Sequence, residues 1–204
     1  EANKMISWFV PFKTVQYESF ARVTIAWSVE GQLNASYNLV DRWAFERPND
    51  TAIIWESDEP GNDVKISFSE LLERVCQVAG VLQSMGVKKG DIIIIYMPMI
   101  PDAVVSMLAC SRIGAVHSVV FAGFSSESLR DRIQDCRARI VMTSDEGRRG
   151  GRTIATKSIV DAALKECDSV EHVLVSKRTA AVDVPWVDGR DKWLDDLAAR
   201  QRTY

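Results

Sequence analysis

Short apolar runs alternate with amphipathic segments over most of the chain. Runs rich in β-branched residues cover residues 92–95, 118–121, 139–143 and 172–175, and each is about as long as a buried strand of a parallel sheet. Segments with apolar residues at helical spacing separate these runs. Strands parted by helices of about ten or more residues are typical of right-handed βαβ crossovers. The pattern therefore predicts an α/β fold with a mostly parallel sheet flanked by helices.

Helix signals accompany the segments between the runs. Ser67 and Glu70 form a capping-box pattern ahead of apolar residues at helical spacing, and Gly86 follows as a stop signal. Pro101 suits the first turn of a helix that runs to Ile113. Further helices are expected over residues 36–45, 125–136, 157–165 and 192–200.

Two regions depart from the alternation. Residues 51–55 and 64–68 read as strands on either side of a turn-rich loop, so they are expected to pair antiparallel at an edge of the sheet. Residues 1–33 are rich in aromatic side chains but have little periodicity. Because aromatic rings bury large areas but form no core by themselves, this segment is expected to be an extension that packs on the core. Residues 182–189 are expected to form a loop.

The composition narrows the class of protein. A content of 47% hydrophobic and 26% charged residues is that of a soluble globular chain, and no apolar run approaches the roughly 18 residues that span a bilayer. The net charge of −3 disfavours nucleic acid as the main partner. The four cysteines lie at wide spacing inside predicted helices, which disfavours zinc and disulfides and fits a cytoplasmic protein. The chain opens on Glu1 without a leader pattern, so we treat it as a fragment.

The candidate chemistry lies in the loops at residues 122–124 and 146–152, which each follow a predicted strand. In open parallel sheets, ligands bind at the carboxyl ends of the strands. The second loop carries three glycines whose amides can approach a ligand and three arginines that can bind phosphate, namely Gly147, Gly150, Gly151, Arg148, Arg149 and Arg152. Such a loop favours an anion, although a solvated turn is about as common. It matches neither a Walker loop nor a G-x-G-x-x-G turn.

Other polar candidates favour structural roles. His117 and His172 lie in strand patterns, where a hydrogen-bonded core or edge histidine is more common than a catalytic one. The serines at 125–126 fit helix capping, because the G-x-S-x-G nucleophile elbow is absent. Asp145 and Glu146 are expected to pair with the neighbouring arginines rather than to act as acid and base.

Four segments carry a resemblance to a known family. They are NASYNLVDR (34–42), AIIWESDEPG (52–61), VKKGDIIIIYMPMIPDAVVSMLACSRIGAVHSVVFAGFS (87–125) and SDEGRRGGR (144–152). Together they resemble the N-terminal part of the acetyl-CoA synthetases, the AMP-forming acetate–CoA ligases of the adenylate-forming superfamily. The likeness runs from Trp8 to the GRDKW segment at 189–193, and the forms FAGFS and ESDEPG resemble the fungal branch.

The resemblance implies a reaction and part of its site. In that family, acetate and Mg-ATP give acetyl-adenylate and pyrophosphate, and CoA then displaces AMP. The DEGxRxGR segment binds the phosphates of the CoA nucleotide end. The implied CoA-binding residues here are Arg149, Gly150, Gly151 and Arg152, with Phe121, Ala122 and Gly123 beside the adenine.

Several motifs of the family are absent from this sequence. The Ser/Thr/Gly-rich phosphate loop, the acetate pocket, the ribose-binding aspartate and the late lysine have no counterpart in this sequence. The ATP and Mg²⁺ sites are therefore expected outside the fragment, which should be inactive alone because no donors reach the transferring phosphate. Residues 1–33 would be the extension and 34–204 the first part of the AMP-binding domain, truncated before the phosphate loop. The full-length enzyme could form a homo-oligomer.

One alternative from another class stays open. The same basic loop would serve a stand-alone non-enzymatic α/β module that binds a nucleotide or a protein partner. A segment like T-S-G-T-T-G within about the next hundred codons of the reading frame would favour the ligase. A native stop codon near Tyr204 would favour the module.

Overall fold

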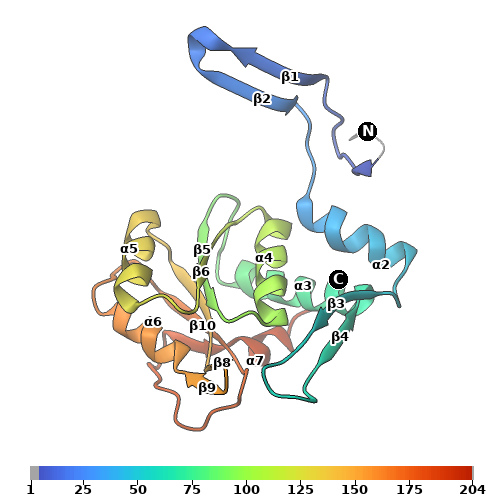
Figure 1. Ribbon diagram of the computed structural model, residues 1–204. Coiled ribbons are helices and arrows are strands. Elements are labelled where there is room, and N and C mark those ends of the chain that lie inside the picture. Colours follow the sequence, from blue (N-terminus) through green and yellow to red (C-terminus); the bar gives the residue numbers. More distant parts are fainter. Residues whose placement is uncertain (1–4, 204) are drawn as a thin grey trace.

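Five parallel strands form the central sheet of the computed structural model, which describes residues 5–203 (Figure 1). The strand order is β11-β10-β7-β5-β6, and every neighbouring pair is parallel. The predicted α/β fold with a parallel sheet is confirmed. The strands are β5 (Ile92–Met97), β6 (Val116–Phe121), β7 (Ile140–Ser144), β10 (His172–Ser176) and β11 (Asp191–Trp193).

Helices cover both faces of this sheet. Strand β5 lies between β7 and β6, and its alternate side chains enter two separate cores, Ile93 and Ile95 on one face and Ile94 and Tyr96 on the other. This explains why the run has no polar side. The helices are α3 (Phe68–Ser84) and α4 (Pro101–Ile113) over the first face, α5 (Ser126–Cys136) and α6 (Thr156–Leu164) over the second, and the short α7 (Leu194–Ala198), which packs beside α3. Within residues 5–203, no helix is long and apolar enough to cross a membrane.

The helix ends follow the sequence signals. The Ser67 hydroxyl accepts a hydrogen bond from the Glu70 amide at 3.3 Å, and the Glu70 carboxylate accepts one from the Ser67 amide at 2.8 Å. Pro101 occupies the first turn of α4, and Gly114 ends that helix with a φ of +77°. The predicted capping box and the predicted α4 bounds are thus confirmed.

The antiparallel pair is correct, but its placement at an edge of the main sheet is wrong. Strands β3 (Thr51–Trp55) and β4 (Val64–Ser67) form their own two-stranded sheet. The edges of the parallel sheet are occupied by β6 and β11, and β4 instead packs beside α3, with Ile66 fully buried. A single strand pair gives no signal for which sheet it joins.

The C-terminal helix was predicted to begin too early. Residues 191–193 are the edge strand β11, and only Leu194–Ala198 form α7. The Trp193 ring stacks on Trp186 at 4.7 Å between ring centroids, so it is held by the preceding loop rather than by a helix face. Cys167 likewise lies beyond the end of α6, outside the helix predicted for it. All four cysteines are free thiols.

The first helix contains a wider turn. Residues 35–46 are helical as predicted, but Tyr37–Asp41 form a π-helical turn, η2, ahead of α2 (Arg42–Glu46). The Asp41 carboxylate, which is nearly buried, accepts two hydrogen bonds from Arg112 of α4 at 2.7 and 2.8 Å. This ion pair fastens the helix to the core.

The aromatic-rich N-terminal segment is a β-hairpin that stands away from the layers (Figure 1). Strands β1 (Thr14–Ser19) and β2 (Thr24–Val29) pair antiparallel around the short turn η1 (Phe20–Arg22). Residues before the hairpin do contact the domain, since Ser7 and Asn38 exchange hydrogen bonds. Phe20 and Trp27 are 102% and 65% exposed among the described residues, and the packing of the aromatic segment on the core stays a prediction. Residues 1–4 lie outside the described part.

Candidate functional site

The carboxyl ends of β5 and β7 border a cavity of about 280 Å³. These neighbouring strands lead into helices on opposite faces of the sheet. Strand β5 leads into α4, whereas β7 leads into α6 by way of residues 145–155. Their crevice is therefore the topological switch point of the sheet, where open α/β folds bind ligands. The lining comes from the last residues of β3 and β6 and from the segments that follow β3, β5, β6, β7 and β10. The position predicted for a ligand thus coincides with a cavity.

The segment predicted as a loop at 146–152 is a tight hairpin. Strands β8 (Gly147–Arg149) and β9 (Arg152–Ile154) pair antiparallel around a two-residue turn. Gly150 and Gly151 have φ values of +56° and +73°, and a turn with two positive φ angles favours glycine at both positions. The two glycines fix the geometry of the turn as well as exposing amides.

The register of this hairpin brings two arginines together. Arg149 lies directly opposite Arg152, and residues that face each other across an antiparallel pair share one side of the ribbon. Both side chains are exposed, and neither has a carboxylate partner among residues 5–203. Like charges in directly opposed positions repel each other. An anion between the two guanidiniums would relieve this repulsion.

Arg149 also contacts the first predicted loop. Its guanidinium lies over the Phe121 ring at 5.3 Å from the centroid. A Cβ atom at Gly123 would lie 2.5 Å from the Phe121 ring, so only glycine lets the chain pass so closely. Phe121, Ala122 and Arg149 line the cavity. Gly150, Gly151 and Arg152 stand outside its lining at the hairpin tip, and the assignment of all these residues to CoA stays a prediction.

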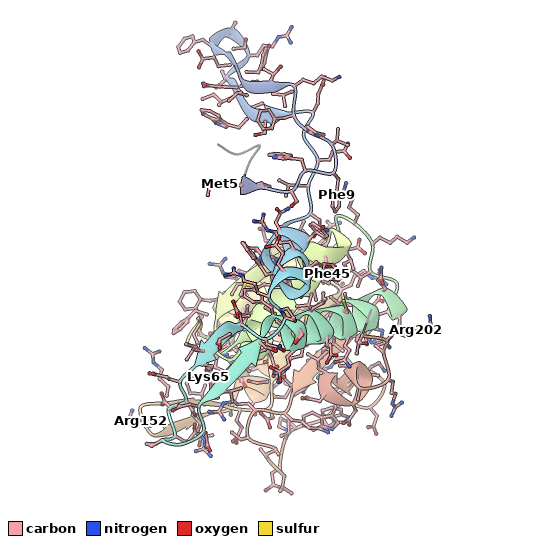
Figure 2. The ribbon with its side chains drawn as sticks, turned by 90° about the vertical axis from the view of Figure 1, so that its right-hand side faces the viewer. Met5, Phe9, Phe45, Lys65, Arg152 and Arg202 are labelled. Carbon is pink, nitrogen blue, oxygen red and sulfur yellow. The ribbon has the colours of Figure 1, made fainter. Side chains whose placement is uncertain are left out.

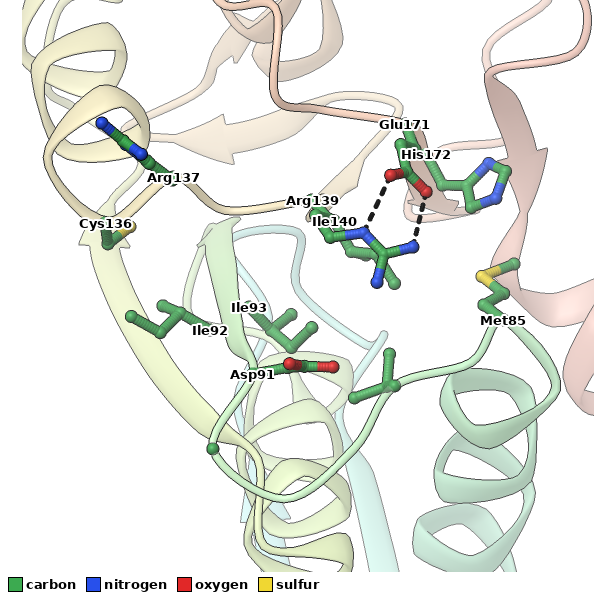
Figure 3. A pocket seen from close by; sticks show the side chains of 12 residues that line it. Met85, Asp91, Ile92, Ile93, Cys136, Arg137, Arg139, Ile140, Glu171 and His172 are labelled. Carbon is green, nitrogen blue, oxygen red and sulfur yellow. Dashed lines mark hydrogen bonds and ion pairs between the residues drawn. The ribbon is translucent and has the colours of Figure 1, made fainter.

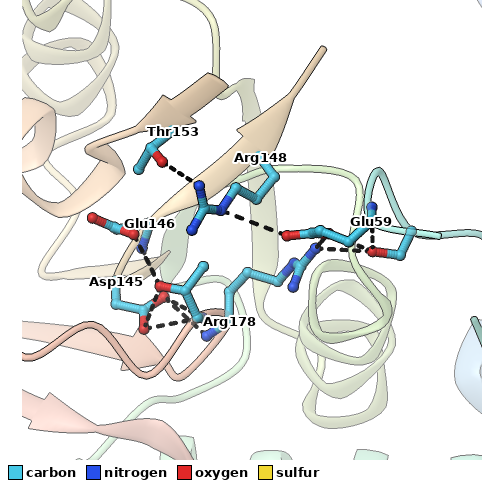
Figure 4. Close-up of polar contacts among 8 residues, drawn as sticks. Glu59, Asp145, Glu146, Arg148, Thr153 and Arg178 are labelled. Atoms are coloured by element: carbon cyan, nitrogen blue, oxygen red, sulfur yellow. Dashed lines mark hydrogen bonds and ion pairs between the residues drawn. The ribbon is translucent and has the colours of Figure 1, made fainter. Parts of the chain in front are cut away.

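The predicted pairing of Asp145 and Glu146 with the neighbouring arginines is wrong. Asp145 is 2% exposed, and its carboxylate accepts backbone amide hydrogen bonds from Glu146, Arg178, Thr179 and Ala181 at 2.7 to 3.2 Å (Figure 4). Glu146 accepts a hydrogen bond from the Thr179 hydroxyl at 3.0 Å. Backbone amides of the turn after β10 thus occupy the Asp145 oxygens that were expected to pair with the arginines. Asp145 ties the exit of β7 to the exit of β10.

Three further residues of the site, Glu59, Arg178 and Trp55, were not predicted as site residues from the sequence. Glu59 lies 2.6 Å from the Arg178 guanidinium and 3.5 Å from that of Arg148 (Figure 4). Arg178 also lies over the Trp55 ring at 4.9 Å. Hydrogen bonds from Ser57 and Arg178 hold the pKa of Glu59 below its usual range, so it is ionised near neutral pH. The sequence marked this loop only by its turn-rich composition and by the family resemblance of residues 52–61, and neither signal assigned a role to Glu59.

The remaining candidates have structural positions. Ser125 caps α5 by accepting a hydrogen bond from the Ser128 amide at 3.4 Å, as predicted. His172 begins β10 at the opposite, amino-terminal edge of the sheet, where it borders a second cavity (Figure 3). There Arg139 is held by two hydrogen bonds to Glu171 at 2.7 and 2.8 Å. His117 lies within β6. Among residues 5–203, no group of three or more His, Cys, Asp or Glu could hold a metal ion.

The chain is similar in sequence to known proteins. A family model described as AMP-binding enzyme matches residues 40–202. Acetyl-coenzyme A synthetase of Coprinopsis cinerea is 59% identical over 204 residues, and acetyl-coenzyme A synthetase 2 of Saccharomyces cerevisiae is 52% identical over 203 residues. The matches cover all of this chain but only 31% and 30% of the relatives. The chain therefore spans about a third of their length.

A solved structure shares the fold. Acetoacetyl-CoA synthetase from Streptomyces lividans superposes with a TM-score of 0.85 over 98% of this chain and 30% of that chain. The identity is 24%, so this likeness concerns the fold alone. It includes the parallel sheet that supports the cavity.

Proposed function

The chain belongs to the family of AMP-binding enzymes, and from that premise we propose that it is the first part of an acetate–CoA ligase. The reaction is the conversion of acetate, ATP and CoA into acetyl-CoA, AMP and pyrophosphate through acetyl-adenylate. In this reaction, the chain would form one wall of the CoA site. The names of its relatives support the activity, and the hairpin β8–β9 supports the role in CoA binding.

The observation that carries the proposal is the opposition of Arg149 and Arg152 across the Gly150–Gly151 turn. A phosphate between the two guanidiniums would relieve their repulsion and accept bidentate hydrogen bonds. The Phe121 ring beneath Arg149 offers an apolar surface to a nucleotide base. A phosphorylated nucleotide such as the adenine end of CoA combines the two features.

The other substrates are assigned to residues beyond this chain. No glycine-rich phosphate loop occurs in its sequence, so the ATP and Mg²⁺ sites are proposed to lie in the remainder of the full-length protein. We assign residues 1–33 to an extension and residues 34–204 to the first part of the AMP-binding domain. Four free thiols fit a reducing cytoplasm, where the full-length enzyme could act as a homo-oligomer.

The test is to replace Arg149 or Arg152 by alanine in the full-length enzyme. Each substitution removes one charge-assisted contact and should raise the KM for CoA about ten- to a hundred-fold. Acetate-dependent pyrophosphate exchange needs no CoA and should persist. Arg132→Ala, at an exposed position of α5, is the matched control. An unchanged KM for CoA, or an equal loss of pyrophosphate exchange, would contradict the proposal.

A further inference from the structure

The loop at residues 56–63 reaches the cavity from outside the parallel sheet. It joins β3 to β4, which form a separate two-stranded sheet, yet Glu56 and Asp58 line the same cavity as Arg149. The indole NH of Trp55 donates a hydrogen bond to the carbonyl oxygen of Met99 at 2.7 Å, which holds the base of the loop against the exit of β5. The loop thus forms a wall of the cavity, and ion pairs connect it to two other lining residues, Arg148 and Arg178.

Glu59 makes these contacts with two arginines, Arg148 of the hairpin β8–β9 and Arg178 of the turn after β10 (Figure 4). One carboxylate oxygen lies 2.6 Å from Nη2 of Arg178, and the other lies 3.5 Å from Nε of Arg148. Arg178 is fixed further, because its amide donates a hydrogen bond to Asp145 at 2.9 Å. Its side chain is only 14% exposed, whereas those of Glu59 and Arg148 are about one third exposed. A single carboxylate therefore joins the loop, the turn after β10 and the hairpin β8–β9.

The contact with Arg148 determines where the next residue points. Successive side chains of a strand lie on opposite faces, so an Arg148 directed at Glu59 leaves Arg149 on the other face, over Phe121. Arg148 also donates a hydrogen bond to the hydroxyl of Thr153, which lies opposite it in the hairpin. The face that carries Arg149 and Arg152 is thereby set by contacts on the reverse face.

We propose that Glu59 is a positioning residue for the CoA site: by holding Arg148 and Arg178, it orients the hairpin so that Arg149 and Arg152 meet the phosphate. The inference rests on the proposed function. It goes beyond that function by assigning a role to an anionic residue, Glu59, that would not touch the ligand. Removing the charge should affect the use of CoA and spare the formation of acetyl-adenylate.

The test is Glu59→Gln in the full-length enzyme, with steady-state kinetics in CoA and pyrophosphate exchange measured side by side. Loss of charge-assisted contacts between partly exposed groups should raise the KM for CoA about five- to ten-fold. The kcat and the exchange rate should change less than about two-fold, a split that a general loss of folding would not give. Glu59→Asp keeps the charge and should recover part of the KM. Glu73→Gln, at an exposed position of α3 outside the cavity lining and without an ion pair in the described structure, is the matched control.

A double-mutant cycle tests the route of the effect. If Glu59 acts on the hairpin through Arg148, Glu59→Gln should add less than about two-fold to the KM for CoA in an Arg148→Gln background. Full additivity, an unchanged KM in Glu59→Gln, or an equal effect of Glu73→Gln would overturn the inference. The outcome is separable from that of the proposed function. Failure of Arg149→Ala to affect CoA use would overturn both, whereas failure of Glu59→Gln alone would overturn only the positioning role.

Discussion

Lys157 is fully buried, and its ammonium group is satisfied by three neighbours. Nζ lies 2.8 Å from the carboxylates of both Asp161 and Asp191 and donates a hydrogen bond to the Pro185 carbonyl oxygen at 3.0 Å. Arg190 also lies 2.6 Å from Asp191. Burial opposes the ionisation of Asp191, but hydrogen bonds from Arg190 and Lys157 hold its pKa below the usual range. This network fastens the long loop before β11 to α6.

Lys157→Met should therefore destabilise the chain by about 3 kcal/mol near pH 7, because it leaves a buried carboxylate with one cation fewer. Since the folded-state pKa of Asp191 is depressed, its ionised form contributes stability above the unfolded pKa of about 3.9, and this contribution is lost as the pH falls further. The difference from the wild type should shrink below about pH 4. Urea unfolding at pH 7 and 3.5 measures it. Lys165→Met, at an exposed site in the same region, is the control, and a cost below about 1 kcal/mol for Lys157→Met would contradict the argument.

Elements defined by contiguous patterns were predictable, and those defined by distant partners were not. The capping box at Ser67 and the apolar run of β5 are local signals, so α3 and the central strand follow from them. Strand β11 has three residues, too few for an alternation, and exists because β10 offers an edge. Glu59 and Arg178 are 119 positions apart, and nothing near either residue indicates the other. The arginine pair was found by residue type, but its shared face depends on the register of a two-residue turn.

That turn gives a prediction at the scale of the hairpin β8–β9. At Gly150, φ is +56° and nothing lies within 4 Å of an added Cβ, so a substitution meets backbone strain alone. Gly150→Ala should cost roughly 1 kcal/mol in local stability, whereas Gly150→Asn should cost less, because asparagine adopts this conformation more readily. Amide hydrogen exchange over residues 147–154 should be faster in the alanine variant. Equal amide exchange rates in Gly150→Ala and Gly150→Asn would mean that the conformation of this turn does not hold the hairpin together.

For the whole molecule, the N-terminal hairpin β1–β2 is the part least supported by the rest (Figure 2). Its register places Ile25 and Trp27 on one side and Val15 and Tyr17 on the other. These four side chains are 45% to 67% exposed, so neither side is covered within the described residues. An isolated pair of strands is marginally stable in water. Local opening of this hairpin should therefore need far less free energy than opening of the parallel sheet.

Limited digestion of the 204-residue chain with trypsin tests this difference, because cleavage requires a locally unfolded segment. Arg22 lies exposed in the turn of the hairpin, and Lys13 precedes β1. The first cuts should fall after these two residues, and the product that begins at Val23 should persist much longer, as followed by intact mass over time. Arg22→Gln should remove this product and leave a long one that begins at Thr14. A first cut inside β8–β9 or in the loop before β11 would instead place the weakest point beside the cavity, despite the contacts of Asp145 and Lys157 that hold the segments there.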